Sequence, residues 1–74
     1  MLARRVIMNT IQRVIELADE RNLSFYQLSD ICDVPYTTLK NAKTRNSQLS
    51  IDTVERICMG LGITMAEFFQ KWNT

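Results

Sequence analysis

The sequence predicts an all-α domain that is built from five short helices. Apolar residues recur at helical spacing in five segments, and residues that favour helix ends flank these segments. No segment alternates apolar and polar residues in the way that a half-buried β-strand does. The chain has 74 residues, of which 46% are hydrophobic and 23% charged, and this is typical of one small globular domain with a thin core.

The first helix is expected over residues 9–22. Asn9 or Thr10 can cap its start, because short polar side chains accept hydrogen bonds from the free amides there. Asn22 favours a left-handed end. The apolar face of this helix is expected to consist of Ile11, Val14, Ile15 and Ala18.

The second helix is expected to begin at Ser24, which can form a capping box with Gln27. Asp33 and Val34 then form a turn, because Asp tolerates the left-handed conformation better than most residues do. The third helix begins at Pro35, since proline is favoured in a first helical turn. The expected buried side of the second helix is Phe25, Leu28, Ile31 and Cys32.

A polar connection leads to the fourth helix, which Ser50 caps and Gly62 ends. Its apolar stripe is expected to be Ile51, Val54, Ile57, Cys58 and Leu61. The fifth helix opens with a second capping box, formed by Thr64 and Glu67. It carries the large apolar residues Met65, Phe68, Phe69 and Trp72.

The third helix separates its residues into a core side and a polar side. The core side gathers Pro35, Thr38, Leu39 and Ala42, and the polar side gathers Tyr36, Thr37, Lys40, Asn41 and Thr44. No acidic residue occurs between Asp33 and Asp52. A DNA duplex carries one negative charge per roughly 1.7 Å of its axis and would repel a carboxylate, whereas polar side chains on a helix can read base edges in the major groove. The pattern therefore indicates DNA binding by this helix, and the outer face of an ordinary soluble helix is the alternative.

The segments, taken in order, resemble the Cro/lambda-repressor-type helix-turn-helix family, also called the XRE family. The resemblance covers about residues 9–70 and rests on "LSFYQLSDICDVPYTTLKNAK" followed by "LSIDTVERICMGLGITMAEFF". The matching positions are Ser24, Leu28-Ser29, Asp33-Val34, Leu39 and Leu61-Gly62-Ile63. Three features depart from the family pattern. Asp33 replaces the usual turn glycine, Pro35 replaces a capping Ser or Thr, and Lys43 and Arg45 replace Glu and Gly.

The resemblance implies a lambda-repressor-like domain of five helices over residues 9–74, preceded by an N-terminal arm over residues 1–8. It implies base contacts in the major groove from Tyr36, Thr37, Lys40 and Asn41. It implies phosphate contacts from Phe25, Lys43, Thr44, Arg45 and Asn46. Three roles are open for Tyr36: contact with a thymine methyl group, a hydrogen bond to phosphate, or packing beside the second helix. Arg4 and Arg5 either follow the DNA or belong to a frayed terminus.

The expected function is sequence-specific binding of double-stranded DNA by a small transcriptional regulator that acts as a homodimer. Neighbouring aromatic residues in the fifth helix cannot all face inward, so Phe69 and Trp72 are candidates for the dimer interface. The alternative at this position is a monomer in which Trp72 folds over the first helix. The alternative function is a protein-interaction module on the same fold, antitoxin-like or an accessory subunit, which suits the net charge of +1.

Several classes of site are not expected. The chain has no histidine, and its two cysteines lie far apart outside any C-x-x-C pattern, so we expect buried thiols and no metal. No catalytic motif is present, so we expect neither an enzyme nor a cofactor or small-molecule ligand. No segment reads as a signal peptide or membrane span, which favours a cytoplasmic protein that does not contact a membrane.

Overall fold

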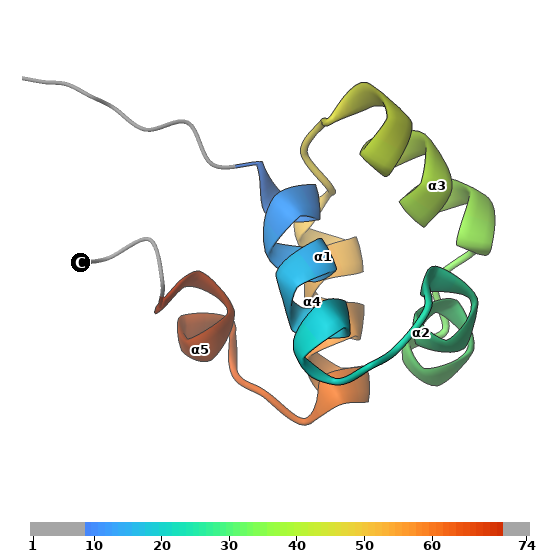
Figure 1. Ribbon diagram of the computed structural model, residues 1–74. Coiled ribbons are helices and arrows are strands. Elements are labelled where there is room, and N and C mark those ends of the chain that lie inside the picture. The colour runs from blue at the N-terminus through green and yellow to red at the C-terminus, as the bar shows by residue number, and fades with distance from the viewer. Residues whose placement is uncertain (1–8, 71–74) are drawn as a thin grey trace, which may run out of the picture.

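The computed structural model describes residues 9–70, and every regular element in this range is helical (Figure 1). The helices are α1 (Thr10–Glu20), α2 (Phe25–Cys32), α3 (Tyr36–Arg45), α4 (Ile51–Leu61) and α5 (Met65–Phe69). The prediction of an all-α domain with five helices is therefore confirmed.

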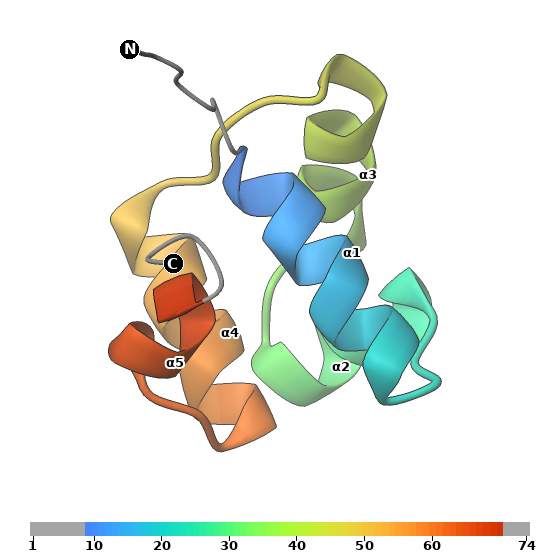
Figure 2. The ribbon, with the colours of Figure 1, turned by 60° about the vertical axis from the view of Figure 1, so that its left-hand side comes forward.

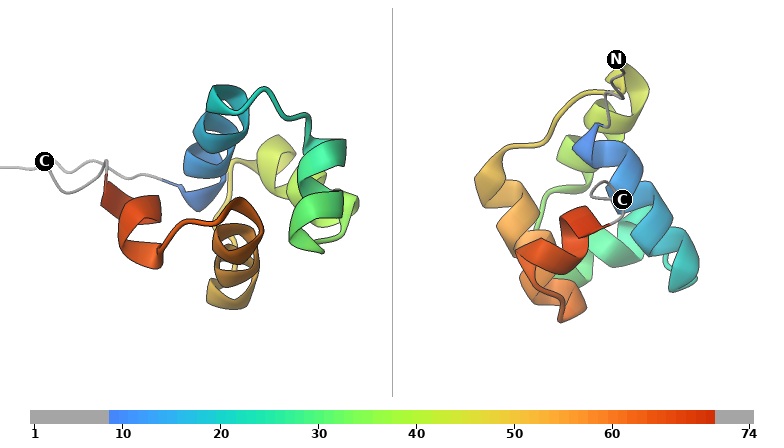
Figure 3. Two further views of the ribbon diagram at one scale, coloured as in Figure 1. Left: turned by 90° about the horizontal axis from the view of Figure 1, so that it is seen from below. Right: turned by 90° about the vertical axis from the view of Figure 1, so that its left-hand side faces the viewer.

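The helices are arranged so that α3 and α5 lie at opposite ends of the molecule. Figure 1 shows α1 and α4 in the middle, with α2 and α3 to one side, and Figure 2 shows α5 beside α4. α2 contacts both α3 and α4, α1 contacts α3, and α4 contacts α5. The left view in Figure 3 shows α5 at the end that faces away from α2 and α3. One side of α3 is therefore free of other helices.

The core receives a fully buried side chain from each helix. These side chains belong to Ile11, Val14, Leu28, Leu39, Val54, Ile57 and Phe68. Burying a side chain of this size stabilises the fold by roughly 1.5–3 kcal/mol. The helices are short, so this shared core supplies most of their stability.

The start of α2 and the start of α5 are fixed by the two predicted capping boxes. Ser24 Oγ accepts from the Gln27 N–H at 3.1 Å, and Gln27 Oε1 accepts from the Ser24 N–H at 2.9 Å. The corresponding distances between Thr64 and Glu67 are 3.0 and 2.8 Å. Each box satisfies two amides that the helix itself leaves without acceptors.

Helix ends at three other positions also follow local signals. Ser50 Oγ accepts from the Thr53 N–H at 3.2 Å and so caps α4. Gly62 ends α4 with φ 71°, and Asn22 lies just after α1 with φ 56°. Both left-handed residues were predicted from their types, because glycine and asparagine adopt positive φ at low cost.

The predicted buried faces need correction at three positions. Ile31 is 48% exposed and Ile51 is 64% exposed. α2 buries only the narrow stripe of Leu28 and Cys32, and Ile51 is the first residue of α4, beside an open loop. Leu17 of α1 is buried but was not predicted to be.

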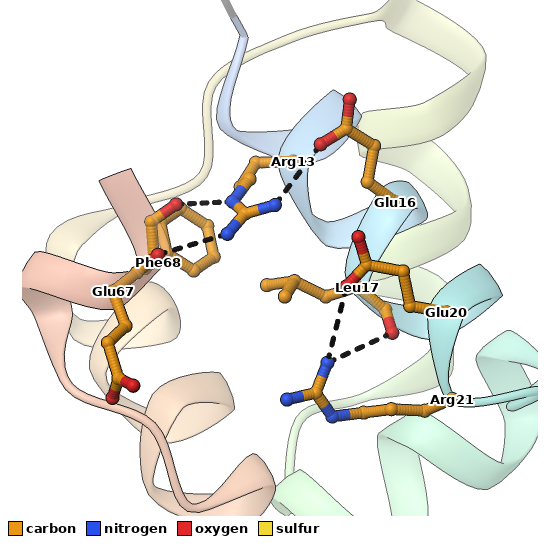
Figure 4. A network of polar contacts seen from close by, with 7 residues as sticks. All are labelled: Arg13, Glu16, Leu17, Glu20, Arg21, Glu67 and Phe68. Atoms are coloured by element: carbon orange, nitrogen blue, oxygen red, sulfur yellow. Dashed lines mark hydrogen bonds and ion pairs between the residues drawn. The ribbon is translucent and has the colours of Figure 1, made fainter. Parts of the chain in front are cut away.

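Arg13 joins α1 to the end of α5 (Figure 4). Its Nε donates to the Phe68 carbonyl, and its Nη2 donates to the Glu67 carbonyl at 3.0 Å. Its Nη1 lies 3.2 Å from Glu16 Oε1 on α1. The guanidinium therefore donates to two carbonyls at the end of α5, and the Glu67 carbonyl also accepts from the Gln70 N–H.

α2 and α4 approach each other closely at Gly60. A Cβ atom at this position would lie 2.6 Å from Cys32 Sγ and 2.8 Å from Cys32 Cα. Only glycine lets the two backbones come this close. The packing of α2, and through it the position of α3, depends on this contact.

Candidate nucleic-acid interface

The turn between α2 and α3 is held by the residues around it. Asp33 has φ 56° and ψ 45°, the left-handed conformation that its position predicted. Val34 is buried, and its N–H donates to the Ser29 carbonyl at 3.1 Å. Arg56 of α4 donates through Nη1 to the Asp33 carbonyl at 3.3 Å. These contacts fix the angle between α2 and α3.

α3 begins one residue later than predicted. Pro35 has φ −56° and ψ 135°, so it is the N-cap residue and not the first helical residue. Its carbonyl accepts from the Thr38 N–H at 3.0 Å, and its side chain makes no capping bond. Pro35 is also exposed, which corrects its placement on the core side. Its backbone lies outside the helix, whose buried side is formed by Leu39 and Ala42.

The outer face of α3 is polar and contains no acidic residue. All four predicted base-contact residues are exposed there, namely Tyr36, Thr37, Lys40 and Asn41. The next exposed residues along the helix are Lys43, Thr44 and Arg45. None of the three basic side chains forms an ion pair within residues 9–70. Their charges are therefore available to a ligand.

One flank of α3 meets the start of α2. Lys43 Nζ lies 5.5 Å from the centre of the Phe25 ring, in a cation–π contact. The amides of Phe25 and Tyr26 open α2, and neither has an acceptor in the part of the chain that the structure describes. Free amides at a helix start bind phosphate well. A cleft of about 610 Å³ lies at this junction, and its lining includes Asp19, Ser24, Phe25, Tyr36, Lys40 and Lys43.

Two of the predicted phosphate-contact residues make hydrogen bonds inside the domain. Thr44 Oγ1 donates to the Lys40 carbonyl at 3.0 Å, so its only proton is already used in this conformation. Asn46 ends α3 with φ 51°, and its Oδ1 accepts from Gln12 Nε2 at 3.0 Å. Its backbone carbonyl accepts from Asn9 Nδ2. The Nδ2 group of Asn46 is the side-chain donor that is left for a phosphate.

The loop after α3 is fastened to the start of α1. Gln48 Oε1 accepts from the Thr10 N–H at 3.0 Å, and Gln48 Nε2 donates to Asn9 Oδ1 at 3.2 Å. The Leu49 N–H donates to Thr10 Oγ1 at 2.6 Å. Asn9 occupies the predicted N-cap position, but its side chain makes no capping bond to α1. Gln48 accepts from the Thr10 N–H at the start of α1 instead, and it is a positioning residue that the sequence did not reveal.

The candidate dimer residues lie at the other end of the domain or outside the described range. Phe69 is half-buried, and its ring centre lies 4.8 Å from that of Phe68 with 70° between the ring planes. It packs partly against the core. Trp72, Arg4 and Arg5 lie outside the described residues.

The two cysteines are free, buried thiols. Burial raises the pKa of both thiols. The nearby Cys58 raises the pKa of Cys32 further, and the Glu55 carboxylate does the same for Cys58. Within residues 9–70, no three His, Cys, Asp or Glu side chains are grouped in a way that could hold a metal ion. No helix in the same range has the length and apolar character needed to cross a membrane.

Comparison with known proteins finds a family model that matches most of the chain, including the helix-turn-helix. Residues 13–70 match the family model described as the Cro/C1-type HTH DNA-binding domain. The match covers more than half of the chain and includes α2, the turn and α3. Searches of curated proteins and of solved structures found no match to the chain.

Proposed function

The chain belongs to the family of Cro/C1-type helix-turn-helix DNA-binding domains, and from this premise we propose that it is a cytoplasmic, sequence-specific regulator of transcription. One observation carries the proposal. The outer face of α3 has no carboxylate and has three basic side chains that form no ion pair with any other described residue, and one side of this helix is free of other helices. Such a helix can enter the major groove without repulsion from the phosphates.

In this proposal α3 reads bases through the residues that it exposes along its outer face. Lys40 donates hydrogen bonds to the O6 and N7 acceptors of guanine, and Asn41 pairs with N6 and N7 of adenine. Thr37 contacts either a base edge or a thymine methyl group through its own methyl group. Tyr36 completes the row at the start of the helix. These contacts give specificity, because each base pair presents a different pattern in the major groove.

The phosphate contacts flank α3 on both sides. The amides at Phe25 and the ammonium of Lys43 bind one strand, because both lie at the cleft between α2 and α3. Arg45 and Asn46 bind phosphate where the chain leaves the groove, and Thr44 joins them if its internal hydrogen bond opens. The loop that carries Asn46 is already held by α1, which lowers the cost of ordering it on DNA.

We further propose that two copies bind together as a homodimer. Dimeric helix-turn-helix proteins place two recognition helices about 34 Å apart, one on each half-site. α5 is at the end of the domain opposite α3, so pairing through Phe69 and Trp72 would leave both recognition helices uncovered. This arrangement supports α5 as the dimer contact.

The experiment that tests the proposal is selection of duplexes from a randomised DNA pool at moderate salt, followed by sequencing. We expect a two-fold symmetric sequence to be enriched, with half-sites one helical turn apart. Lys40→Ala should weaken binding to the selected duplex by at least about fivefold, because a good base contact contributes roughly 1–3 kcal/mol. Arg21→Ala is the matched control, since it removes one positive charge from the end of α1 and leaves α3 intact.

The alternative function is a protein-interaction module on the same fold. One observation favours it: Ile31 and Met59 are exposed on α2 and α4, on a shallow surface away from the row of base-reading residues. The selection distinguishes the two functions. If no duplex is enriched and none is retained even at low salt, the DNA-binding proposal is wrong and the alternative gains weight.

A further inference from the structure

Two exposed tyrosines stack on each other across the helix-turn-helix. The ring centres of Tyr26 and Tyr36 lie 4.8 Å apart, with 19° between the ring planes. Tyr26 comes from the first turn of α2 and is 72% exposed, while Tyr36 opens α3 and is 36% exposed. Each ring therefore covers one face of the other and leaves its edges in solvent. The sequence offered packing beside α2 as one of three roles for Tyr36, and the structure assigns Tyr26 as the partner.

The backbone on both sides of the stack is held by local structure. The capping box of Ser24 and Gln27 holds the first turn of α2, where Tyr26 lies. Pro35, the residue before Tyr36, has φ fixed at −56° by its ring. A ring that stacks on its neighbour has less freedom to lose than an isolated ring, so binding to it has a lower entropic cost.

The surroundings of the stack disfavour an anionic ligand on one side. A groove of about 580 Å³ borders the pair, and its lining includes Tyr26, Gln27, Asp30, Pro35 and Tyr36. The Asp30 carboxylate disfavours a phosphate in this groove, because both groups are negative. The basic residues Lys40 and Lys43 lie on the other side of Tyr36, in the cleft described above. The aromatic rings and Pro35 at this groove can contact an uncharged, apolar group.

In the major groove, the apolar group on a base edge is the C5 methyl group of thymine. We infer that Tyr26 is a positioning residue that holds Tyr36 against this methyl group, so that the pair specifies a thymine beside the bases that Thr37 and Lys40 read. The inference rests on the proposed function, since it requires α3 to lie in the major groove. It adds a specificity residue on α2, outside the recognition helix.

The test uses the duplex that the full-length protein selects from the random pool. Each thymine in one half-site is replaced in turn by uracil, which removes the methyl group and keeps every hydrogen-bonding atom. We expect one replacement to weaken wild-type binding by about three- to fivefold, the effect of one methyl group leaving an apolar contact. Tyr36→Ala should bind the thymine and uracil duplexes equally.

Tyr26→Ala should also bind the thymine and uracil duplexes equally, although Tyr26 need not touch the base. Tyr26→Phe keeps the stack and should restore the three- to fivefold preference for thymine. Met59→Ala is the matched control, because Met59 is also highly exposed and lies on α4. Thermal unfolding of each variant confirms that the ratio of affinities is measured on folded protein.

The outcomes separate this inference from the proposed function. Wild-type protein that binds every uracil duplex as tightly as the thymine duplex overturns the inference and leaves DNA binding intact. A Tyr26→Ala variant that still prefers thymine overturns the positioning role of Tyr26. A pool that yields no enriched duplex overturns the proposed function and the inference together.

Discussion

At the scale of single residues, Gly60 limits the distance between α2 and α4. An added Cβ would overlap both the side chain and the backbone of Cys32, and a backbone atom cannot rotate away. Overpacking of this kind costs roughly 1–3 kcal/mol, while replacing a helical glycine by alanine gains up to about 1 kcal/mol in propensity. Gly60→Ala should therefore lower the free energy of unfolding by about 1–2 kcal/mol in a urea titration.

The neighbouring residue provides the control for this prediction. Met59 is largely exposed, so Met59→Ala should change the free energy of unfolding by less than about 0.5 kcal/mol. An equal or higher stability for Gly60→Ala would show that α2 and α4 can separate without loss. The close approach would then not determine the position of the helix-turn-helix.

The buried thiols predict how stability changes at alkaline pH. Burial raises the pKa of Cys32 and Cys58 above the ordinary value of 9.0. Near and above pH 9.0 the unfolded thiols release protons while the folded thiols retain them, so the unfolded state becomes relatively more stable. The free energy of unfolding should be constant up to about pH 8 and then fall, by at most about 1.4 kcal/mol per pH unit for each thiol.

Urea titrations between pH 7 and 10 measure this dependence, and Cys32→Ala is the comparison. The variant has lower absolute stability because a buried side chain becomes smaller. Its fall in stability with pH should be shallower, since one thiol is missing. All other titratable side chains are the same in the two proteins, so the comparison isolates the missing thiol. Parallel curves for the two proteins would contradict the prediction.

At the scale of helices, α5 depends on Arg13 for its attachment to α1. The guanidinium donates to two carbonyls at the end of a helix with only five residues. Arg13→Met keeps much of the side-chain volume but removes both hydrogen bonds that the charged guanidinium donates, at a cost of roughly 1.5–3 kcal/mol. We expect a lower unfolding midpoint and faster hydrogen exchange of the α5 amides.

Arg21→Met is the control for the role of Arg13. Arg21 is more exposed, and it bonds only the Leu17 carbonyl, at 3.4 Å, and Glu20 on its own helix. Surface interactions of this type contribute between about 0 and 1 kcal/mol. If both variants lose the same stability, or if exchange in α5 does not change for Arg13→Met, the attachment of α5 must depend on its apolar packing and not on Arg13.

Helix ends and helix attachments differ in how well the sequence predicted them. Both capping boxes and the left-handed Asp33 and Gly62 were predicted correctly, because their signals lie within four residues of each helix end. The hydrogen bond from Thr10 to Gln48 joins residues 38 positions apart, and the one from Arg13 to Phe68 joins residues 55 apart. No periodic pattern carries information on such partners.

The candidate site shows the same division. Exposure of the polar side of α3 was predicted correctly, because helical geometry alone determines which residues share a face. The stack of Tyr26 on Tyr36 and the hydrogen bonds of Asn46 depend on how separate elements pack. Ile31 and Ile51 were placed in the core for a related reason: apolar character does not reveal which residues another helix covers.

At the scale of the whole molecule, the net charge of +1 hides a strong separation of charges. The chain has nine basic and eight acidic residues, yet no acidic residue lies between Asp33 and Asp52. Phosphate contacts release counterions, so the affinity for DNA falls as salt concentration rises, with a slope of about −0.9 in log–log form for each phosphate neutralised. A nearly neutral protein with one basic face should therefore show a small slope that its few basic residues on α3 determine.

Lys43→Ala tests which residue provides that slope. Because Lys43 lies beside the open start of α2, we expect it to neutralise one phosphate, so its loss should reduce the slope by about 0.9. Affinity should fall by a similar factor for every sequence, since phosphate contacts carry no base information.

Tyr36→Ala should do the opposite, with an altered sequence preference and an unchanged slope. Binding measured between 50 and 200 mM salt, roughly the range over which such slopes are resolved, distinguishes the two variants. A Lys43→Ala variant that keeps the wild-type slope but changes the preferred sequence would mean that Lys43 reads a base, and α3 would then lie deeper in the groove than we propose.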